Sequence, residues 1–175
     1  MRIFFLFLIL CCMFSAATVY AAQVCKTDSI PASTPDSQLI DNGNGTVTDS
    51  KTGLMWKRCL EGVKGDNCKD GTPSLLTWQQ ALKQPGTVNT GGGFAGHTDW
   101  RLPEIKELRS LIEGQCFGPA INLNRFPNTP SSNVWSGSSS AHLSGYAWSV
   151  GFAYGHFDIF TRTSRFAVRL VRGGQ

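Results

Sequence analysis

Four cysteines follow an N-terminal export signal, and this combination most strongly limits how the chain can fold. They are Cys25, Cys59, Cys68 and Cys116. An even number of cysteines in an exported chain indicates disulfide bonds, and four cysteines allow three pairings. Cys59 and Cys68 enclose a short polar loop, so we predict that these two pair. The long bond then joins Cys25 to Cys116.

The export signal is predicted to occupy residues 1–22. Met1 and Arg2 precede an apolar run, residues 3–14, and a small-residue stretch follows that ends at Ala22. A charged start, an apolar middle and a small-residue cleavage region are typical of a secretory signal peptide. The run is too short to span a bilayer, which takes about 20 residues. We therefore expect an exported protein that is periplasmic, secreted or at the cell surface.

A lipid anchor is the alternative, because Cys11 and Cys12 lie in the apolar run. Leu10 precedes Cys11, at a position where lipoprotein signals have a small residue, so the sequence favours cleavage without lipidation. No second apolar run follows in the sequence. We expect the mature protein to be soluble and not to span the membrane.

The mature chain has the size of one domain with a hydrophobic core. Cleavage after Ala22 leaves 153 of the 175 residues. Loss of Arg2 changes the formal charge from +4 to +3. This mild charge, without a block of Lys or Arg, argues against binding to nucleic acid. The three histidines are scattered and no C-x-x-C spacing occurs, so we expect no metal site and no cofactor.

The first part of the mature chain is predicted to be extended and rich in β-structure. Residues 23–38 carry Pro, Ser and Thr and form an extended lead-in. Residues 39–56 show short apolar runs separated by Asn-Gly turns, which predict a β-hairpin or meander. A calcium loop is the alternative, but this segment lacks the closing glutamate of an EF-hand. The oxygen ligands would be Asp41, Asn42, Asn44 and Asp49.

Two short helices are predicted in the middle of the chain. The first covers residues 77–84, begins with a Thr-x-x-Gln capping box and ends at Pro85. The second covers residues 103–114, with proline in its first turn and Gly114 as its stop. Its apolar residues fall on one face and should pack on a sheet. They are Ile105, Leu108, Leu111 and Ile112.

The chain after Pro130 lacks helical periodicity and is rich in Gly, Ser and aromatic residues, which predicts several short strands. Four apolar residues recur there at period two beside Trp148 and are predicted to be core positions. They are Val150, Phe152, Val168 and Leu170. Few helices, many strands and two disulfides describe an α+β domain.

Residues 153–166, AYGHFDIFTRTSRF, mix aromatic and charged side chains without a clean period. We predict that they form an exposed hairpin tip or loop, because aromatic rings and Arg on exposed loops make recognition surfaces. Some of these residues are expected to be ordinary packing residues, above all Phe157 and Phe160. The predicted ligand contacts are Tyr146, Tyr154, His156, Asp158, Arg162, Arg165 and Phe166.

No catalytic arrangement is evident in the sequence. A G-x-S-x-G elbow, a phosphate-binding glycine loop and an arranged pair of carboxylates are all missing, and residues 91–94 are predicted to be a plain loop. His97 or Asp99 could be catalytic. The pairing of Asp99 with Arg101 as a structural ion pair before the second helix is favoured instead. We therefore expect that the protein is not an enzyme.

Five ordered motifs resemble the Lcl C-terminal domain family. They are DNGNGTVTDSKTGLMW, TWQQAL, GHTDWRLPEIKEL, INLNRFPNTPSS and FAVRLVRGG, within residues 39–175. Members of this family resemble C-type lectins in fold and occur as exported or surface binding modules, and its adhesin members bind glycans, including sulfated polysaccharides. The resemblance implies a C-type-lectin-like binding domain with a protein or glycan ligand on a cell surface.

Two other classes of function stay open. The same broad fold resembles that of formylglycine-generating enzymes, which would make the protein a periplasmic enzyme, but fold analogy alone is weak support for chemistry. The cysteines that such an enzyme uses are already assigned to disulfides here. A structural subunit of a surface assembly is the other alternative, and it would co-purify with a partner.

Residues 131–174 also resemble the variable end of target proteins that retroelements diversify on a C-type-lectin frame. Mutation of template adenines cannot create Lys, Glu, Gln, Met or Trp from Asn codons. Residues 23–130 contain 18 Lys, Glu, Gln and Met, a frequency that would place about seven in the 44 residues 131–174, and these contain none. Sheet composition explains part of this gap. Trp135 and Trp148 would belong to the fixed frame.

Overall fold

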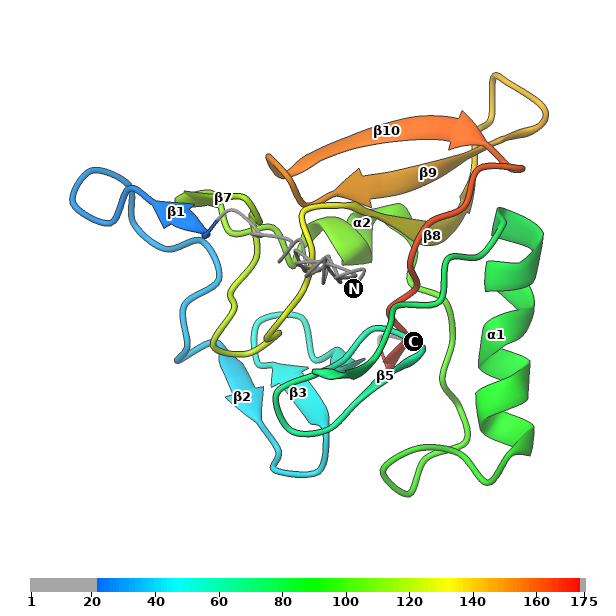
Figure 1. Ribbon diagram of the computed structural model, residues 1–175, viewed down its shortest axis with the longest axis horizontal. Coiled ribbons are helices and arrows are strands. Elements are labelled where there is room, and N and C mark those ends of the chain that lie inside the picture. The colour runs from blue at the N-terminus through cyan, green and yellow to red at the C-terminus, as the bar shows by residue number, and fades with distance from the viewer. Residues whose placement is uncertain (1–21, 174–175) are drawn as a thin grey trace, which may run out of the picture.

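The computed structural model describes residues 22–173, which form an α+β fold with two disulfides, as predicted (Figure 1). The helices are α1 (Trp78–Thr90) and α2 (Ile105–Arg109). The strands are β1 (Val24–Cys25), β2 (Leu39–Asp41), β3 (Thr46–Asp49), β4 (Met55–Lys57), β5 (Val63–Lys64), β6 (Asp70–Gly71), β7 (Cys116–Phe117), β8 (Asn133–Ser139), β9 (Tyr146–Gly151), β10 (His156–Thr161) and β11 (Val171–Arg172). The predicted signal peptide lies, except for Ala22, outside the described residues.

Every pairing between neighbouring strands is antiparallel, and the two larger sheets have the orders β11-β4-β3-β2 and β10-β9-β8. The predicted hairpin is the β2–β3 pair, where the N–H of Asn42 donates to the carbonyl of Thr46 over 3.0 Å. Two-stranded pairs β1–β7 and β5–β6 complete the fold. No helix within residues 22–173 is long and apolar enough to cross a membrane.

Both disulfides are the predicted ones. Cys59 bonds to Cys68 across nine positions of sequence, and Cys25 bonds to Cys116 across 91. The long bond joins β1 to β7, whose residues pair directly at Cys25 and Cys116. Disulfides of this kind fit an exported protein.

The hydrophobic core lies between the two larger sheets and the helices. The four core positions predicted near the C-terminus are confirmed, because Val150, Phe152, Val168 and Leu170 are fully buried. Trp135 is also fully buried, and its indole N–H donates to the carbonyl of Leu76 over 2.8 Å.

The prediction that α1 ends at Pro85 was wrong, because the helix continues to Thr90. Proline removes one backbone hydrogen bond from a helix interior. Tertiary contacts compensate, because Pro85 itself is buried and the side chain of Asn89 holds the backbone of Trp100. The Asn89 amide donates to the Trp100 carbonyl over 2.8 Å and accepts from its N–H over 3.0 Å.

The second helix is shorter than predicted, since α2 ends at Arg109 and not near Gly114. After Arg109 the N–H groups of Leu111 and Ile112 bond three residues back, and Ile112 then forms a β-bridge with Ile121. The predicted apolar face nevertheless packs as expected: Leu108 and Leu111 are fully buried against β8 and β9 side chains.

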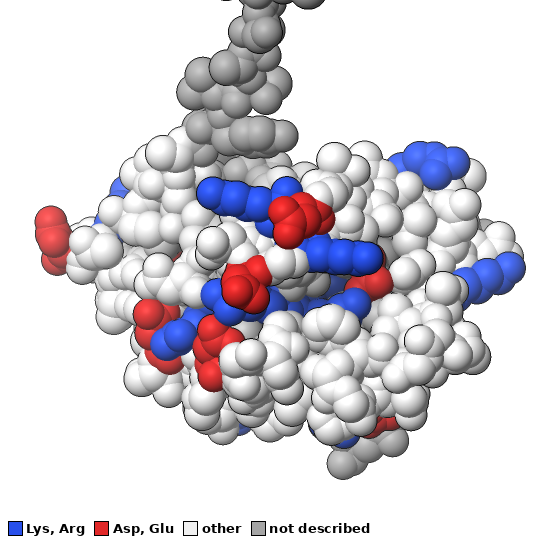
Figure 2. Space-filling view, turned by 60° about the horizontal axis from the view of Figure 1, so that its bottom comes forward, with Lys and Arg blue, Asp and Glu red and all other residues white. Residues whose placement is uncertain are grey.

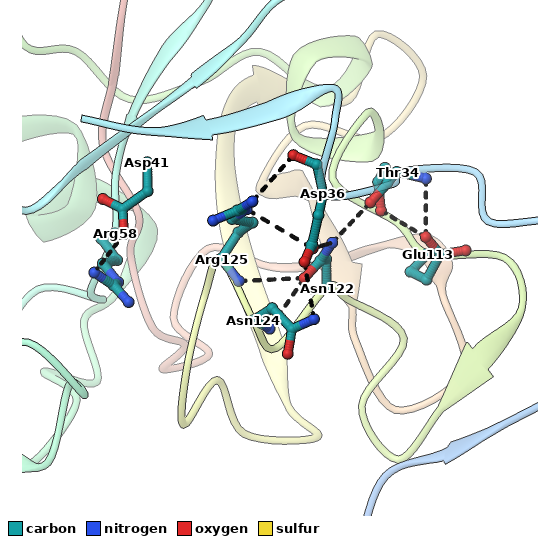
Figure 3. A network of polar contacts seen from close by, with 8 residues as sticks. All are labelled: Thr34, Asp36, Asp41, Arg58, Glu113, Asn122, Asn124 and Arg125. Atoms are coloured by element: carbon teal, nitrogen blue, oxygen red, sulfur yellow. Dashed lines mark hydrogen bonds and ion pairs between the residues drawn. The ribbon is translucent and has the colours of Figure 1, made fainter. Parts of the chain in front are cut away.

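The lead-in, residues 23–38, packs closely on the rest of the fold (Figure 3). The buried carboxylate of Glu113 accepts hydrogen bonds from the backbone and hydroxyls of Ser33 and Thr34, at 2.8 to 3.1 Å. Asp36 accepts from the side-chain amides of Asn122 and Asn124, at 2.8 and 3.1 Å. Polar side chains therefore tie the start of the mature chain to residues 113–125.

Candidate functional site

The predicted ligand contacts lie on or beside β9 and β10, which form an antiparallel ladder from His156–Gly151 to Thr161–Tyr146. The prediction of a hairpin tip or loop was therefore wrong for residues 156–161. β10 is the outer strand of its sheet, so both of its faces and one edge are exposed to varying degrees. A strand that is exposed on both faces shows no apolar alternation. The sequence pattern therefore did not reveal β10 as a strand.

His156 and Asp158 share one face of β10, because residues two apart in a strand point the same way. Both side chains are exposed. The His156 ring lies over Gly151 of β9, where an added Cβ would be 2.5 Å from a ring carbon. A glycine is therefore required at position 151 for this ring position. The Asp158 carboxylate accepts a hydrogen bond of 2.7 Å from the N–H of Ile159.

Tyr154 is in the turn between β9 and β10 and is 77% exposed. Its ring stacks on Phe117 of β7, with centroids 6.5 Å apart and planes 23° apart. The neighbouring Gly155 has φ +71°, and a Cβ there would lie 2.6 Å from Ile112. Because of this close approach, the turn lies against the residues that follow α2. The stacked rings of Tyr154 and Phe117 lie at the surface beside it.

Arg162 and Tyr146 lie at the other end of the β9–β10 ladder. The guanidinium carbon of Arg162 is 4.4 Å from the ring centroid of Trp78, and its Nε donates to the carbonyl of Tyr146 over 3.3 Å. The Tyr146 side chain is half-buried. Arg162 therefore joins α1 to the β8–β10 sheet, and it is separated along β10 from the exposed face of His156.

Phe166 and Arg165 follow β10. The Phe166 ring packs between Trp135, with centroids 4.7 Å apart, and Phe160, with centroids 5.0 Å apart. Arg165 is exposed, and its Nη1 donates to the carbonyl of Leu75 over 3.4 Å. Of the seven predicted contacts, the structure thus brings His156 and Asp158 together, places Tyr154 beyond one end of β10, and gives Phe166 a packing position.

The opposite face of β10 brings Phe157 together with two cations of α2 that were not among the predicted contacts. The guanidinium carbon of Arg109, on α2, lies 3.8 Å from the ring centroid of Phe157, which is 42% exposed. Phe157 is also 6.1 Å from the half-buried Trp148. Lys106 lies one turn before Arg109, and both are exposed. Their spacing of three residues on the polar face of a helix was the available signal.

Two adjoining grooves run beside this face. The first has a volume of about 470 Å³ and separates α2 from the start of β10. The second has a volume of about 320 Å³ and continues past Gly114 to the rings of Phe117 and Tyr154. The first is lined by Ser33, Lys106, Arg109, Ser110, Ile112, Gly114, Gly155 and Phe157, and the second by Lys26, Ile30, Gly114, Gln115, Cys116, Phe117 and Tyr154. Three of these residues are cations and none is an acid.

Five ion pairs form elsewhere among the described residues. Figure 2 shows Lys and Arg lying beside Asp and Glu in one band on the face that it presents. The predicted Asp99–Arg101 pair is wrong, because each residue has another partner. The pairs are Lys57–Glu61, Arg58–Asp41, Arg101–Glu107, Arg125–Asp36 and Arg172–Asp99. Within residues 22–173, Lys106 and Arg109 form no ion pair.

The pKa values of several acids follow from these contacts. The hydrogen bond from Arg172 lowers the pKa of Asp99. Burial alone would raise the pKa of Glu107, but hydrogen bonds from Arg101 and from the Glu104 N–H lower it overall. Both carboxylates are therefore ionised at neutral pH and occupied by structural partners. No group of three or more His, Cys, Asp or Glu side chains within residues 22–173 is placed to hold a metal ion.

Comparison with known families gives one match. The model of the Lcl C-terminal domain matches residues 45–172, which includes both helices and both larger sheets except β2. A comparison with curated proteins finds no match. The matched region contains β10 and α2, whereas Lys26, Ile30 and Ser33 of the grooves precede it. Since it covers most of the chain, the protein belongs to the Lcl C-terminal domain family.

Proposed function

We propose that this protein is an exported binding module with a C-type-lectin-like fold, which recognises a protein or glycan through the surface around β10. We define the β10 surface by Arg109, Tyr154, His156, Phe157 and Asp158. The observation that carries the proposal is the exposure of aromatic and charged side chains on both faces of one edge strand. Exposed aromatic rings and Arg are the residues that most often anchor protein interfaces.

The chemistry of the β10 surface suits such ligands. The stacked rings of Tyr154 and Phe117 offer a flat apolar face to a sugar ring or to a side chain of a protein partner. Arg109 can form two parallel hydrogen bonds with a carboxylate or a sulfate group. His156 and Asp158 add hydrogen-bonding groups on the second face of the strand.

An enzyme and a structural subunit are the competing proposals. His156 and Asp158 are both exposed at the surface of β10, a position that suits ligand contact. Turnover of a substrate by the purified protein would favour the enzyme. Constant co-purification with one partner in fixed ratio would favour the structural subunit.

The test is a screen of the purified protein on a glycan array and against surface proteins. The variant carries Arg109→Ala, Tyr154→Ala and His156→Ala together, and the matched control carries Ile40→Ala, Lys64→Ala and Asp66→Ala, which are exposed elsewhere. We expect the first variant to lose binding to the identified ligand with an unchanged circular dichroism spectrum and Tm, and the control to bind normally. Unchanged binding by the first variant would place the ligand site elsewhere.

A further inference from the structure

The outer edge of β10 is open. β10 ends the order β10-β9-β8, and no other strand lies beyond it within residues 22–173 (Figure 1). The N–H of Arg162 donates to the carbonyl of Gly145 over 2.8 Å, one step beyond the Thr161–Tyr146 pair. Antiparallel ladders alternate between bonded and non-bonded pairs. Residues 156, 158 and 160 therefore bond to β9, and residues 157, 159 and 161 direct their backbone groups outward.

Backbone N–H and C=O groups at two alternate residues of β10 are available to a partner. The N–H and C=O of Phe157 and the C=O of Ile159 point to this edge. The N–H of Ile159 is held by the Asp158 carboxylate at 2.7 Å, a contact within the strand that an arriving carbonyl can replace. The carbonyl of Thr161 is already used, because it accepts from the N–H of Ser164 over 2.9 Å. Phe157 and Ile159 thus form a short pairing site.

The groove between α2 and the start of β10 is basic. Lys106 and Arg109 line it together with Phe157, and its lining contains no Asp or Glu. Side chains three apart on a helix have Cβ atoms about 5–6 Å apart. Side chains two apart on a strand lie about 7 Å apart and point to the same side. An extended chain along β10 can therefore direct two acidic side chains to the two cations.

We propose that the edge of β10 binds an extended acidic polypeptide segment of a partner protein, which pairs with Phe157 and Ile159 as a fourth strand. Alternate acidic side chains of this segment meet Lys106 and Arg109 in the groove. The other face of the added strand lies beside Asp158, which disfavours acidic residues there. The ligand pattern is thus acidic residues alternating with neutral or basic ones.

A polypeptide fits this site better than a glycan because of the backbone groups. Strand addition gives affinity through main-chain hydrogen bonds and specificity through alternate side chains. A polysaccharide could use the cations and rings but would leave the row of outward N–H and C=O groups without the regular partners that a strand supplies. This inference rests on the proposed function, since it names the partner class for the same surface.

The test uses acetylated and amidated eight-residue peptides of alternating Glu and Thr, measured by isothermal titration calorimetry. The comparison peptides have Gln for Glu, or carry N-methyl groups on the backbone amides with all side chains kept. We expect binding of the Glu-Thr peptide and at least tenfold weaker binding of both comparison peptides. The Lys106→Ala/Arg109→Ala variant should also bind at least tenfold more weakly, and the Lys64→Ala control should bind normally.

A structural measurement accompanies the titration. Amide hydrogen exchange at Phe157 should be fast in the free protein and at least tenfold slower with the Glu-Thr peptide bound. Equal binding of the N-methylated peptide, or no binding of the Glu-Thr peptide, would overturn the strand-addition proposal. A sulfated dextran that binds where the peptide fails would leave the proposed binding function standing with a glycan ligand. If neither the Glu-Thr peptide nor the sulfated dextran binds, and the ligand screen also finds no ligand, the proposed function itself is rejected.

Discussion

The guanidinium carbon of Arg109 lies 3.8 Å from the ring centroid of Phe157 and joins α2 to the edge strand β10. Both side chains are exposed, and Arg109 has no acidic partner within the described residues. The contact holds a cation above a ring at the border of a groove without acids. The contact therefore holds the guanidinium group of Arg109 in place without neutralising its charge.

A double-mutant cycle on this pair should give a coupling free energy of about 0.5–1 kcal/mol, as for exposed cation–π contacts. The variants are Arg109→Ala, Phe157→Ala and both together, and the measurement is urea unfolding. Both side chains are exposed, so each single change should reduce the free energy of unfolding only slightly. A coupling free energy of zero would show that Arg109 moves freely in solution and that its charge is not positioned.

The sequence was sufficient to predict features that depend on local chemistry. Asn42 and the glycine that follows it predicted the β2–β3 hairpin correctly. The capping pair Thr77 and Gln80 predicted the start of α1 correctly. Both disulfides followed from the number and spacing of the cysteines. In each case the controlling contacts lie within a few residues or among very few candidates.

Features that depend on distant contacts were predicted poorly. Pro85 did not end α1, because Asn89 binds the backbone of Trp100, which no local pattern reveals. Asp99 pairs with Arg172 from β11 rather than with its neighbour Arg101. The contact surface also depended on tertiary structure, since Arg109 comes from α2 and meets β10 only after folding.

Two aromatic residues in one turn should differ strongly in their effect on stability. Phe152 is fully buried, and Tyr154 is 77% exposed. Phe152→Ala should lower the free energy of unfolding by about 3–5 kcal/mol, because it removes a large core side chain. Tyr154→Ala should change it by about 0.5 kcal/mol or less. Chemical denaturation of both variants checks this, and similar losses would mean that Tyr154 belongs to the core.

Acid should weaken the attachment of the lead-in. Burial alone would raise the pKa of Glu113, but hydrogen bonds from Ser33, Thr34 and Gln115 lower it below its ordinary value. A carboxyl with a lowered folded-state pKa contributes stability that is present above its unfolded pKa and is lost as the pH falls through the folded-state pKa. This contribution should thus decline below about pH 4.5.

Glu113→Gln tests this contribution. The variant should be less stable than the original protein by about 1–3 kcal/mol at pH 7, because buried N–H groups lose a charged acceptor. The difference should shrink as the pH falls through the lowered folded-state pKa of Glu113, below which both side chains are neutral. Urea unfolding at several pH values measures it, with the exposed Asp66→Asn as control. A difference independent of pH would show that shape, not charge, matters at this position.

Removal of the two disulfides should have unequal effects. Chain entropy gives about 4.6 kcal/mol for the bond that closes the Cys25–Cys116 loop and about 2.7 kcal/mol for the Cys59–Cys68 loop. We therefore expect the Cys25→Ser/Cys116→Ser variant to have the lower Tm. Thermal unfolding of the two double variants compares them directly. The reverse order would show that the polar contacts of Glu113 and Asp36 hold the lead-in without the long bond.

Diversification by a retroelement would produce a pattern of variation that the structure defines. Residues 131–174 contain no Lys, Glu, Gln or Met, and they include β8, β9 and β10 with both exposed and buried positions. Replacement of a buried side chain here costs several kcal/mol, whereas replacement at the surface costs little. Variation that accumulates under selection for folding must therefore concentrate on exposed positions.

Sequencing of the gene in many sibling cells tests this expectation. Substitutions should gather at exposed positions of this region, including Tyr154, His156, Phe157 and Asp158. They should spare the fully buried Trp135 and also Arg169, whose Nη1 donates to the carbonyl of Lys57 over 2.9 Å. Variation spread evenly over the whole chain, or an invariant β10, would reject diversification. β10 would then be better described as a surface that binds one fixed ligand.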